Sequence, residues 1–505
     1  MKIYLAGYNV DTVVLSELKE KYGDRTDITP EVISAAYARI SRDPRSINEI
    51  RKDARLEVER TRKSNETIIF KMGHHSVAEH AVFNLDIVGL SRLAMEELEK
   101  FRLSSFTEKS QRYITLDKDF VIPEEIKNTP LEKEFVDIVH LQNNAYHEYY
   151  GILKSYVFKK YSELASDPKK HNLLEGWAKE DARYITALAT ESQVGLTVNA
   201  RNLELMLRRF ASSSLSEIRE LGSQIYSQIS EVAPSVVLFH QANDKDVKTY
   251  PELKKLLSGK TKQKSQTKFS EVKLVDYTKM GDDVIAASLM HTSSNMPFDA
   301  CLSSLKKMSN KAKADIFKTS FSNMQFYDSA LREFEYANLT YNVVLSSACF
   351  GQLKRHRMST ITSQPYDISL GITIPESIKE IGKEKHFKEI ILKTEKIYAK
   401  MLKDVPLIAP YILTNAHRKR VLIRLNAREM CHISRLREDA HAQWDIRNIS
   451  SKMSVLAKKA MPLTFMMLCG KDKYNETYQK VFSKSPKIIE AVLPGARKIK
   501  EGVKS

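Results

Sequence analysis

A long internal repeat constrains this chain of 505 residues more than any other feature of its sequence. Each half carries four signposts in the same order: a strand-like run that leads into a helical segment, an Ile-Pro-Glu, an Asn-Ala-Arg, and an acidic residue followed by Ile-Arg. The last two lie at 199–201 and 217–219 in the first half and at 426–428 and 445–447 in the second. A repeat of this length must be settled before a fold is assigned, because both copies then have to form the same structural unit.

The stretch between the two halves predicts a solvated linker. Residues 258–268, SGKTKQKSQTK, are rich in Ser, Gly, Thr, Lys and Gln and have almost no apolar side chains. Such a composition is typical of flexible connections. Because the chain is also longer than one hydrophobic core usually allows, we predict a first domain at 1–243, a lysine-rich linker at 244–272 and a second domain at 273–505.

The local pattern in each half predicts an α+β fold. Phe83, Leu85 and Ile87 alternate with polar residues, as in a half-buried strand, and Ser91 is placed to cap a helical segment that runs to Glu99. The second half repeats this pattern, with strand positions at 339, 341 and 343 and a cap at 346 or 347. Long amphipathic helices are expected after each Asn-Ala-Arg. We therefore predict two tandem copies of a mostly helical domain with a small antiparallel sheet, and a first strand within MKIYLAGYNVDTVVL at the N-terminus.

Charge and cysteine content limit the function classes. The formal net charge of +17 suits a protein that binds nucleic acid, one that handles small polyanions such as nucleotides and folates, or simply a lysine-rich surface. The lysines are spread along the chain, and no helix-turn-helix, RNP or zinc-finger pattern is present, so we expect no specific nucleic-acid partner. No apolar run approaches the length of a membrane span. The four cysteines include no CxxC pair, which predicts a reducing compartment, the cytoplasm, and no structural zinc.

Three consecutive basic residues, Arg355 to Arg357, end the helical segment of the second half. Gln352 lies three residues earlier, on the helical face of Arg355, and the polar stretch MSTITSQPY follows. This arrangement could grip a diphosphate, and a basic helix C-cap is the alternative. In the first half Glu108, Ser110 and Arg112 alternate, so an extended backbone would place them on one side. A carboxylate, a hydroxyl and a guanidinium together suit a nucleotide, and a polar surface turn is the alternative.

These two segments resemble the signature of flavin-dependent thymidylate synthases, Arg-His-Arg, a short gap, Ser and then Glu-x-Ser-x-Arg-Tyr, divided here between the two halves. GHHSVAEH at 73–80 is similar to the family's Gly-His-x-Ser/Thr-x-x-Glu-His, and ARIS at 38–41 and the Asn-Ala-Arg segments add to the resemblance. NAREMCHISRLREDAHAQWDI at 426–446 looks like an intact family helix. The resemblance covers about half of the chain in blocks, and it leaves out the linker and residues 127–180, whose role stays open.

The resemblance implies a role for each matching residue. For dUMP it implies Gln352, Arg355 and Arg437 in the second half and Glu108, Ser110, Arg112 and Arg183 in the first. For FAD it implies Ser41, Ser76, Glu79, Thr107 and Glu108 in the first half and His356, Arg357, Asn426, Arg428, His432 and His441 in the second. His74 matches the histidine expected near the flavin and the folate. The expected catalytic set is His74, Ser110, Arg355 and Arg437, with Ser110 as a positioning hydroxyl and the two arginines stabilising charge that develops on the pyrimidine.

The two halves lack different parts of the motif. The first half has Lys100 and Phe101 where Arg-His belongs, and Arg209 or Phe210 at the dUMP arginine. The second half has Ser, Pro and Asp at 363, 365 and 367, and Pro410 at the position of Arg183. Random decay would not be expected to leave one complementary set. Because family members are homotetramers with shared sites, we predict a homodimer of tandem chains that forms a pseudo-tetramer.

The resemblance implies conversion of dUMP to dTMP, with 5,10-methylene-tetrahydrofolate as carbon donor and FAD, reduced by NADPH, as hydride source. A thiolate nucleophile would need a cysteine beside basic groups, and only Cys431 falls within an arginine-rich block, at a packing position. A flavin- or nucleotide-binding pseudoenzyme is the main alternative, and a nucleic-acid-binding protein is a weaker one. The histidines at 74, 75 and 80 with Glu79 miss the inverted zinc spacing by one residue, so we expect no metal.

Overall fold

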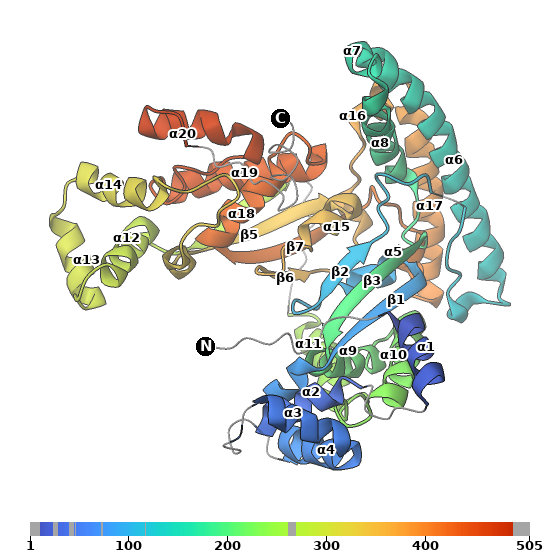
Figure 1. Ribbon diagram of the computed structural model, residues 1–505. Coiled ribbons are helices and arrows are strands. Elements are labelled where there is room, and N and C mark those ends of the chain that lie inside the picture. Colours follow the sequence, from blue (N-terminus) through green and yellow to red (C-terminus); the bar gives the residue numbers. More distant parts are fainter. Residues whose placement is uncertain are drawn as a thin grey trace, which may run out of the picture. The chain divides into compact units, whose positions relative to one another are not determined.

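The computed structural model describes residues 11–23, 29–39, 45, 47–71, 74–116, 118–260 and 269–487 (Figure 1). Ser41 and residues 1–10 lie outside the described residues. The described end of the predicted first strand is helical instead, because Asp11 caps α1 (Thr12–Tyr22). The chain divides into two compact units, which are described separately. Unit 1 consists of Met1–Lys179, Thr186–Lys264 and Lys385–Leu413, and unit 2 of Glu180–Ile185, Ser265–Glu384 and Thr414–Ser505.

Unit 1 contains a three-stranded antiparallel sheet in the order β1-β3-β2. Its strands are β1 (Val82–Ser91), β2 (Ser105–Glu108) and β3 (Glu191–Asn199). Phe83 and Ile87 lie on one face, as the alternation predicts, and pack with residues of α9 and α10 in one core. The register of β1 shifts between Val88 and Leu90, where Gly89 has a φ of 80°, a conformation that glycine adopts without steric cost.

The helices of unit 1 include several that pack on the buried face of this sheet and others that extend away from it (Figure 1). They are α1 (Thr12–Tyr22), α2 (Glu31–Arg39), α3 (Ile47–Leu56), α4 (Val58–Asn65), α5 (Arg92–Leu98), α6 (Pro130–Lys160), α7 (Ser162–Ala165), most of α8 (His171–Ala182), α9 (Ala200–Ala211), α10 (Ser216–Val232), α11 (Asp244–Leu257) and nearly all of α17 (Glu384–Asp404). The long helix α6 packs along α17, and the Gln142 side chain donates to the Thr394 hydroxyl at 2.8 Å and to the Ile412 carbonyl at 3.0 Å.

Unit 2 contains a four-stranded antiparallel sheet in the order β4-β5-β7-β6. The strands are β4 (Val272–Tyr277), β5 (Asn338–Ser346), β6 (Thr360–Ser363) and β7 (Arg418–Asn426). Strands β5, β6 and β7 correspond to β1, β2 and β3 of unit 1, with the same neighbours and the same antiparallel pairing. The prediction of two copies with small antiparallel sheets is therefore confirmed, and the fold is predominantly helical.

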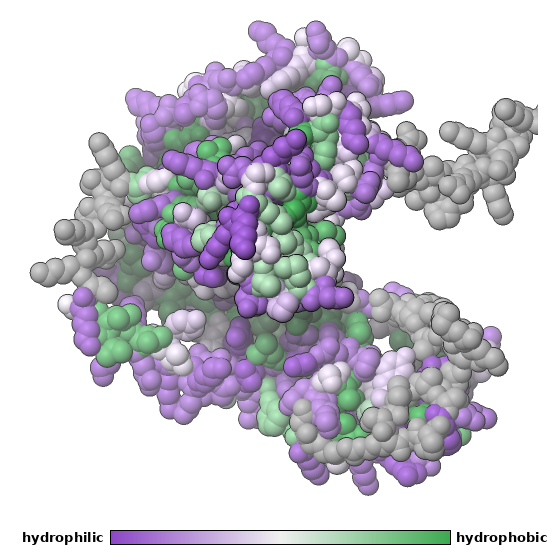
Figure 2. All heavy atoms as spheres, turned by 90° about the vertical axis from the view of Figure 1, so that its left-hand side faces the viewer, coloured by the Kyte–Doolittle hydropathy of each residue, from purple (hydrophilic) through white to green (hydrophobic). Residues whose placement is uncertain are grey.

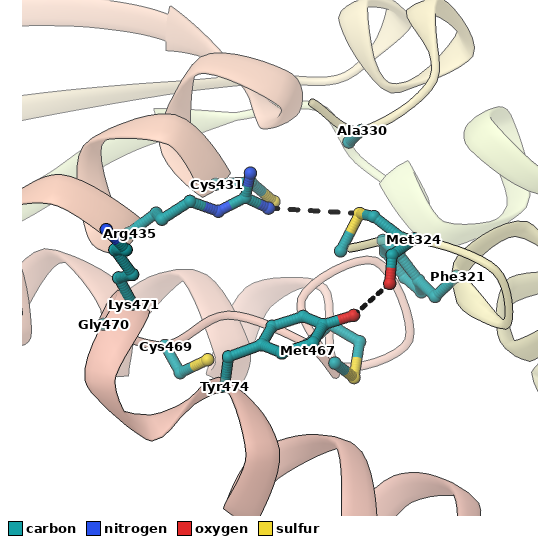
Figure 3. A pocket seen from close by; sticks show the side chains of 10 residues that line it. All are labelled: Phe321, Met324, Ala330, Cys431, Arg435, Met467, Cys469, Gly470, Lys471 and Tyr474. Atoms are coloured by element: carbon teal, nitrogen blue, oxygen red, sulfur yellow. Dashed lines mark hydrogen bonds between the residues drawn. The ribbon is translucent and has the colours of Figure 1, made fainter. Parts of the chain in front are cut away.

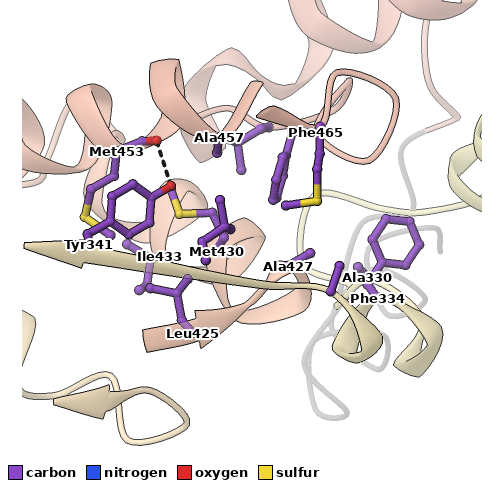
Figure 4. Close-up of a cluster of buried hydrophobic side chains, with 14 of the residues drawn as sticks. Ala330, Phe334, Tyr341, Leu425, Ala427, Met430, Ile433, Met453, Ala457 and Phe465 are labelled. Atoms are coloured by element: carbon purple, nitrogen blue, oxygen red, sulfur yellow. Dashed lines mark hydrogen bonds between the residues drawn. The ribbon is translucent and has the colours of Figure 1, made fainter. Parts of the chain in front are cut away.

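The helices of unit 2 cover one face of its sheet and bury an apolar core. They are α12 (Gly281–Thr292), α13 (Phe298–Lys307), α14 (Asn310–Phe321), α15 (Ser347–Leu353), α16 (Glu376–Glu380), α18 (Ala427–Arg437), α19 (Trp444–Ala460) and α20 (Tyr474–Phe482). Figure 4 shows Tyr341 of β5 against Met430 and Ile433 of α18 and Met453 of α19, with the Tyr341 hydroxyl donating to the Met453 carbonyl at 3.0 Å.

Two segments have exchanged places between the repeats. Glu180–Ile185 comes from the first half of the sequence but belongs to unit 2, and Lys385–Leu413 comes from the second half but belongs to unit 1. Backbone hydrogen bonds hold both segments: Ala416 donates to Tyr184 at 2.9 Å in unit 2, and Leu188 donates to Leu413 at 2.7 Å in unit 1. Each unit therefore contains residues of both repeats.

Two predicted helix starts, at the caps Ser91 and Ser346, are confirmed, and Asn199 and Asn426 also act as caps. Ser91 and Ser346 accept hydrogen bonds from the backbone at the starts of α5 and α15, and Asn199 and Asn426 do so for α9 and α18. Each side chain satisfies a backbone N–H that has no partner within the helix.

Three other sequence-based expectations about backbone shape are also wrong. The segment 426–446 is not one helix, because α18 ends at Arg437 and Gln443 caps a new helix, α19. His441 therefore does not share a helix face with Arg437. Helix α15 ends at Leu353, so Arg355 follows the helix that carries Gln352. The extended run from Glu108 to Arg112 stops where β2 ends, and residues 111–114 form turns, with the Arg112 backbone N–H donating to the Ser110 hydroxyl at 3.2 Å.

The predicted linker at 244–272 contains a helix over its first half. Asn243 caps α11, whose first turn is acidic and whose last turn is basic, so both ends complement the helix dipole. These end signals outweigh the polar composition of the segment. Residues 261–268 lie outside the described residues, and β4 begins at Val272.

Hydrophilic side chains cover most of the surface that is visible in Figure 2, and hydrophobic ones form smaller groups. In the part of the chain that the structure describes, every helix is too short or too polar to cross a membrane.

Candidate active site

The polar interior of unit 2 is organised around Arg437, at the end of α18. Its Nε donates to Nε2 of His356 at 2.8 Å, and its Nη2 donates to the Gln352 carbonyl oxygen at 3.1 Å. His356 and Gln352 are both buried. The guanidinium is thus held on two of its nitrogens, as a group that must present a fixed geometry to an anion would be.

A segment of the first repeat joins this network through a glutamine. The Gln352 side chain donates to the Gln443 side-chain oxygen at 3.3 Å, and Gln443 Nε2 donates to the Tyr184 hydroxyl at 2.8 Å. Tyr184 follows Arg183, whose backbone carbonyl accepts from the Asn415 side chain at 3.1 Å. Arg437 and the segment that carries Arg183, from different repeats, are therefore joined by hydrogen bonds through Tyr184.

A buried carboxylate anchors Tyr184. Asp445, in the first turn of α19, accepts from the Tyr184 hydroxyl at 3.0 Å and from the Ser346 hydroxyl at 2.6 Å. Burial raises the pKa of Asp445, although both hydrogen bonds lower it. The carboxylate links the helix cap of α15 to the segment that carries Arg183.

A second carboxylate holds the other side of the same segment. Asp181 accepts from the Trp444 indole N–H at 2.7 Å and from the Ser377 hydroxyl at 2.5 Å. The Trp444 ring stacks on the Tyr184 ring, with centroids 5.5 Å apart. Arg183 therefore lies between two residues that are each fixed by the second repeat.

The titration of Asp181 gives a testable pH dependence. Burial raises the pKa of this carboxyl from its ordinary value of 3.8 to about 6. A carboxyl with a higher pKa in the folded protein contributes stability below about pH 4, and that stability is lost as the pH rises through 6. With about 1.4 kcal/mol for each pKa unit, the contribution is at most about 3 kcal/mol.

We therefore expect the stability difference between wild type and Asp181→Asn to shift against the wild type by up to about 3 kcal/mol from pH 4 to pH 7. Urea unfolding at each pH measures it. Asp439→Asn is the control with the opposite sign, because burial would raise the pKa of Asp439 but hydrogen bonds from His441 lower it. A pH-independent difference for Asp181→Asn would contradict the prediction.

A pocket of about 210 Å³ opens next to this network. Asn426, Arg428, Glu429 and His432 line it, together with Arg435 and Met358. Arg428 and His432, four residues apart, share the pocket face as the helix period predicts. Arg428 donates to the Ala330 carbonyl and to the Glu335 carboxylate, both at 2.8 Å. Asn426 is committed to its capping bond, so its side-chain oxygen has a structural role here.

Beside it lies a much smaller cavity that contains two thiols (Figure 3). Cys431 and Cys469 line it, Arg435 reaches the Met324 sulfur at 4.0 Å, and the Tyr474 hydroxyl donates to the Met324 carbonyl. Burial raises the pKa of Cys431 to about 12 and also raises the pKa of Cys469 and of Cys349. These three thiols are protonated at neutral pH and are poor nucleophiles. Within the described ranges, no three His, Cys, Asp or Glu residues are grouped so that they could hold a metal ion.

Comparison with known proteins identifies the family. The model of the thymidylate synthase complementing protein family matches residues 25–235 and 273–463. The chain belongs to this family.

Two kinds of relatives match the chain. A flavin-dependent thymidylate synthase of Clostridium tetani is 31% identical over 210 residues, which are 41% of this chain and 80% of that protein. UPF0159 proteins match along most of the chain: that of Chlamydia muridarum is 24% identical over 81% of this chain and 80% of its own length, and that of Thermoplasma acidophilum is 22% identical over 85% and 92%. The match to the flavin-dependent thymidylate synthase has the length of a single repeat. The matches to the UPF0159 proteins extend over both repeats.

Several residues predicted from the family motif lie in unit 1. His74 precedes the 3-10 helix His75–His80 and is exposed, as are Ser76 and Glu79, and Glu79 pairs with Arg201. Thr107 is exposed on β2. The Glu108 carboxylate forms a buried ion pair with Arg92 at 2.7 Å, and Arg112 lies over the Tyr113 ring. Their predicted roles stay predictions.

The remaining predicted residues lie in unit 2 and differ in their exposure. Arg355 and Arg357 are exposed, and His441 is exposed and bonded to Asp439 at 2.8 Å. Gln352, His356, Arg183 and Arg437 are the members that the structure brings together. His432 lies at the rim of the pocket, with its ring 5.8 Å from that of His356.

In unit 1, the thymidylate synthase complementing protein domain has lost this polar site. Phe101 and Phe210 stand at the positions of His356 and Arg437, and their rings pack edge to face with centroids 5.6 Å apart. The anchoring network nevertheless persists: the Tyr411 hydroxyl and the Ser91 hydroxyl donate to Glu217 at 2.6 and 2.7 Å. Both units thus have a carboxylate in this network, Asp445 in unit 2 and Glu217 in unit 1. The arginine, Arg437, is present in unit 2 and replaced by Phe210 in unit 1.

Sequence reasoning missed Tyr184, Gln443, Asp445 and Asp181 as members of the site. The repeated acidic-Ile-Arg marked Asp445 and Glu217, but only as signposts of the repeat. An acidic residue that recurs at the start of a helix in both copies was the available signal. Asp181 and Trp444 have no such signal, because their contact joins distant parts of the chain.

Proposed function

We propose that this protein is an FAD-dependent thymidylate synthase that converts dUMP to dTMP with methylene-tetrahydrofolate as carbon donor and NADPH as reductant. One observation carries the proposal: Arg437 is fixed by His356 and Gln352 in one network with the Arg183 segment of the other repeat. A guanidinium held in this way, with the Arg183 segment tied into the same network, suits the phosphate of a nucleotide.

In this proposal the protein contributes binding and orientation. Arg183 and Arg437 hold the phosphate of dUMP, and Gln352 and Arg355 contact the nucleotide. Arg355 and Arg437 also stabilise negative charge on the pyrimidine. Glu108, Ser110 and Arg112 of the first repeat complete the substrate site, and a homodimer that forms a pseudo-tetramer assembles the copies.

The pocket beside Arg437 suits one part of a flavin cofactor. The guanidinium groups of Arg428 and Arg435 and the imidazole of His432 line this pocket. They can donate hydrogen bonds to the carbonyl oxygens and phosphates of such a molecule. At about 210 Å³ it is smaller than the roughly 300 to 1,000 Å³ typical of sites that enclose a whole ligand, so other residues must hold the rest, and Ser76, Glu79 and Thr107 are proposed for this. When bound, FAD would supply the hydride. The high thiol pKa values of Cys349, Cys431 and Cys469 support chemistry without a cysteine nucleophile.

The test is tritium release from [5-³H]dUMP with FAD, NADPH and methylene-tetrahydrofolate. We expect release that depends on all three. A protein that purifies with bound flavin but releases no tritium would support the alternative of a flavin-binding pseudoenzyme. A protein that binds neither flavin nor dUMP would contradict both.

Mixing two inactive variants tests how the substrate site is shared. We expect Arg112→Ala and Arg355→Ala to be inactive alone. If the two residues of one site come from different chains, co-expression restores up to about one quarter of the activity, because half of the dimers are mixed and each mixed dimer regains one of two sites. No restoration indicates that both residues come from one chain or that they share no site, and full activity of either variant alone would exclude that residue from the site.

A further inference from the structure

The Arg437 guanidinium is the end of a buried three-residue chain. Its Nε donates to His356 Nε2 at 2.8 Å, and the other ring nitrogen, Nδ1, lies 3.3 Å from a carboxylate oxygen of Glu429. Glu429 and Arg437 lie on the same helix, α18, and His356 comes from the segment after α15. A carboxylate, an imidazole and a guanidinium thus stand in a row.

The protonation state of His356 follows from its surroundings. The side chain is 2% exposed, and burial together with the charge of Arg437 lowers the pKa of His356 to about 3. A neutral imidazole has one N–H. Since the Arg437 Nε–H can only donate, Nε2 must be the acceptor, and the proton must be on Nδ1, which faces Glu429.

The first repeat shows that the three positions change together. Where unit 2 has His356, Glu429 and Arg437, unit 1 has Phe101, Asn202 and Phe210. The two phenylalanines pack against each other, so an apolar contact stands where unit 2 has His356 and Arg437, and the Asn202 side chain bonds to Asn199 instead. By contrast, the anchoring carboxylates, Asp445 and Glu217, are kept in both repeats. The three residues therefore behave as one unit, separate from the structural network.

We propose that Glu429 is a positioning residue that fixes the tautomer of His356, so that His356 Nε2 holds the Arg437 guanidinium in the orientation that binds the nucleotide phosphate. This role rests on the proposed function. The arrangement parallels other sites in which a carboxylate behind a histidine selects which ring nitrogen carries the proton.

Replacing Glu429 with glutamine tests the chain with little change of volume. The glutamine amide can donate to Nδ1, which would move the ring proton to Nε2. Two N–H groups would then face each other between His356 and Arg437, and the guanidinium would lose this support. Glu429→Asp keeps the charge on a shorter side chain and should restore part of the lost affinity.

The first measurement does not depend on substrate. In ¹⁵N-histidine-labelled full-length protein at pH 7.5, with the His356 signal assigned by its absence in His356→Gln, we expect a neutral ring protonated on Nδ1. In Glu429→Gln the proton should move to Nε2. A wild-type ring protonated on Nε2, or a tautomer that Glu429→Gln leaves unchanged, would overturn the proposal.

The second measurement is dUMP affinity by calorimetry. We expect Glu429→Gln to weaken binding on the order of tenfold, as the loss of one buried hydrogen bond implies. Because the residues act in series, adding Glu429→Gln to His356→Gln should cause little further loss. Asp283→Asn, which removes a carboxylate paired with Lys313 elsewhere in unit 2, is the control and should bind as wild type does.

The two measurements separate the possible failures. The expected tautomer change with no dUMP binding by the wild type would support the positioning chain and contradict the proposed substrate. Normal dUMP binding by Glu429→Gln, despite a changed tautomer, would overturn the positioning role and leave the proposed function intact.

Discussion

Replacing Arg437 with alanine is expected to lower kcat/KM for dUMP by about 10²- to 10³-fold, the range seen when a fixed donor to developing charge is removed. The guanidinium makes hydrogen bonds to His356 and to the Gln352 carbonyl at the same time, so its position is set before substrate binds. Arg437→Lys should also be strongly impaired, because an ammonium group is a point charge that does not reproduce a planar fork.

The matched control comes from the other repeat. Arg209, next to the counterpart position in α9, lies over the Phe101 ring at 5.9 Å in the apolar version of the site. Arg209→Ala removes the same charge and should leave kcat/KM for dUMP unchanged. Steady-state kinetics with tritium release measures both variants, and circular dichroism checks their fold. Equal losses in the two variants would show that overall positive charge, and not the Arg437 geometry, supports the activity.

Replacing Asp445 with alanine is expected to lower the free energy of unfolding of unit 2 by about 3 to 5 kcal/mol. The side chain is buried and accepts two hydrogen bonds, from Tyr184 and Ser346. Hydrogen bonds to a charged group contribute about 1.5 to 3 kcal/mol each, and the variant leaves two buried hydroxyl groups without their acceptor. Asp445→Asn keeps the size and one oxygen, so it should cost about half as much.

The two tryptophans allow this loss to be assigned to a unit. Trp177 lies in unit 1 and Trp444 in unit 2, next to Asp445. In a Trp177→Phe background, urea unfolding followed by tryptophan fluorescence reports on unit 2 alone. Glu217→Ala, monitored through Trp177 in a Trp444→Phe background, should show a comparable loss in unit 1, where Tyr411 and Ser91 lose their acceptor. A small, equal effect of Asp445→Ala and Asp445→Asn would contradict the prediction.

The contrast between these two predictions reflects how the repeats have diverged. The carboxylate network joins a helix cap to the exchanged segment, and each unit needs it to hold a segment from the other half of the sequence. The hydrogen bond between His356 and Arg437 does not hold an exchanged segment. In unit 1, Phe101 and Phe210 stand at the positions of these two residues. The carboxylate network is therefore present in both copies, whereas the polar arrangement around Arg437 is present in one.

The amino-acid sequence alone was sufficient for features that depend on neighbours along the chain. Strands β1 and β5 follow from alternating apolar residues, the starts of α5 and α15 follow from their serine caps, and the duplication follows from repeated signposts. Gln352, His356, Arg183 and Arg437 were found through the family motif. Local patterns do not predict every helix end. They predict one helix over 426–446, although Gln443 begins a new helix, and they do not predict α11 in the lysine-rich stretch.

Only the tertiary structure could show the exchange of Glu180–Ile185 and Lys385–Leu413 between the units, and with it the contacts of Tyr184 and Asp181 with α19. These contacts join residues more than 250 positions apart, and no periodicity or cap encodes such a pairing. They form because a buried hydroxyl or carboxylate must find a partner when the chain folds, and that partner is chosen by three-dimensional packing. Sequence patterns therefore determine the elements, and packing decides which of them share a site.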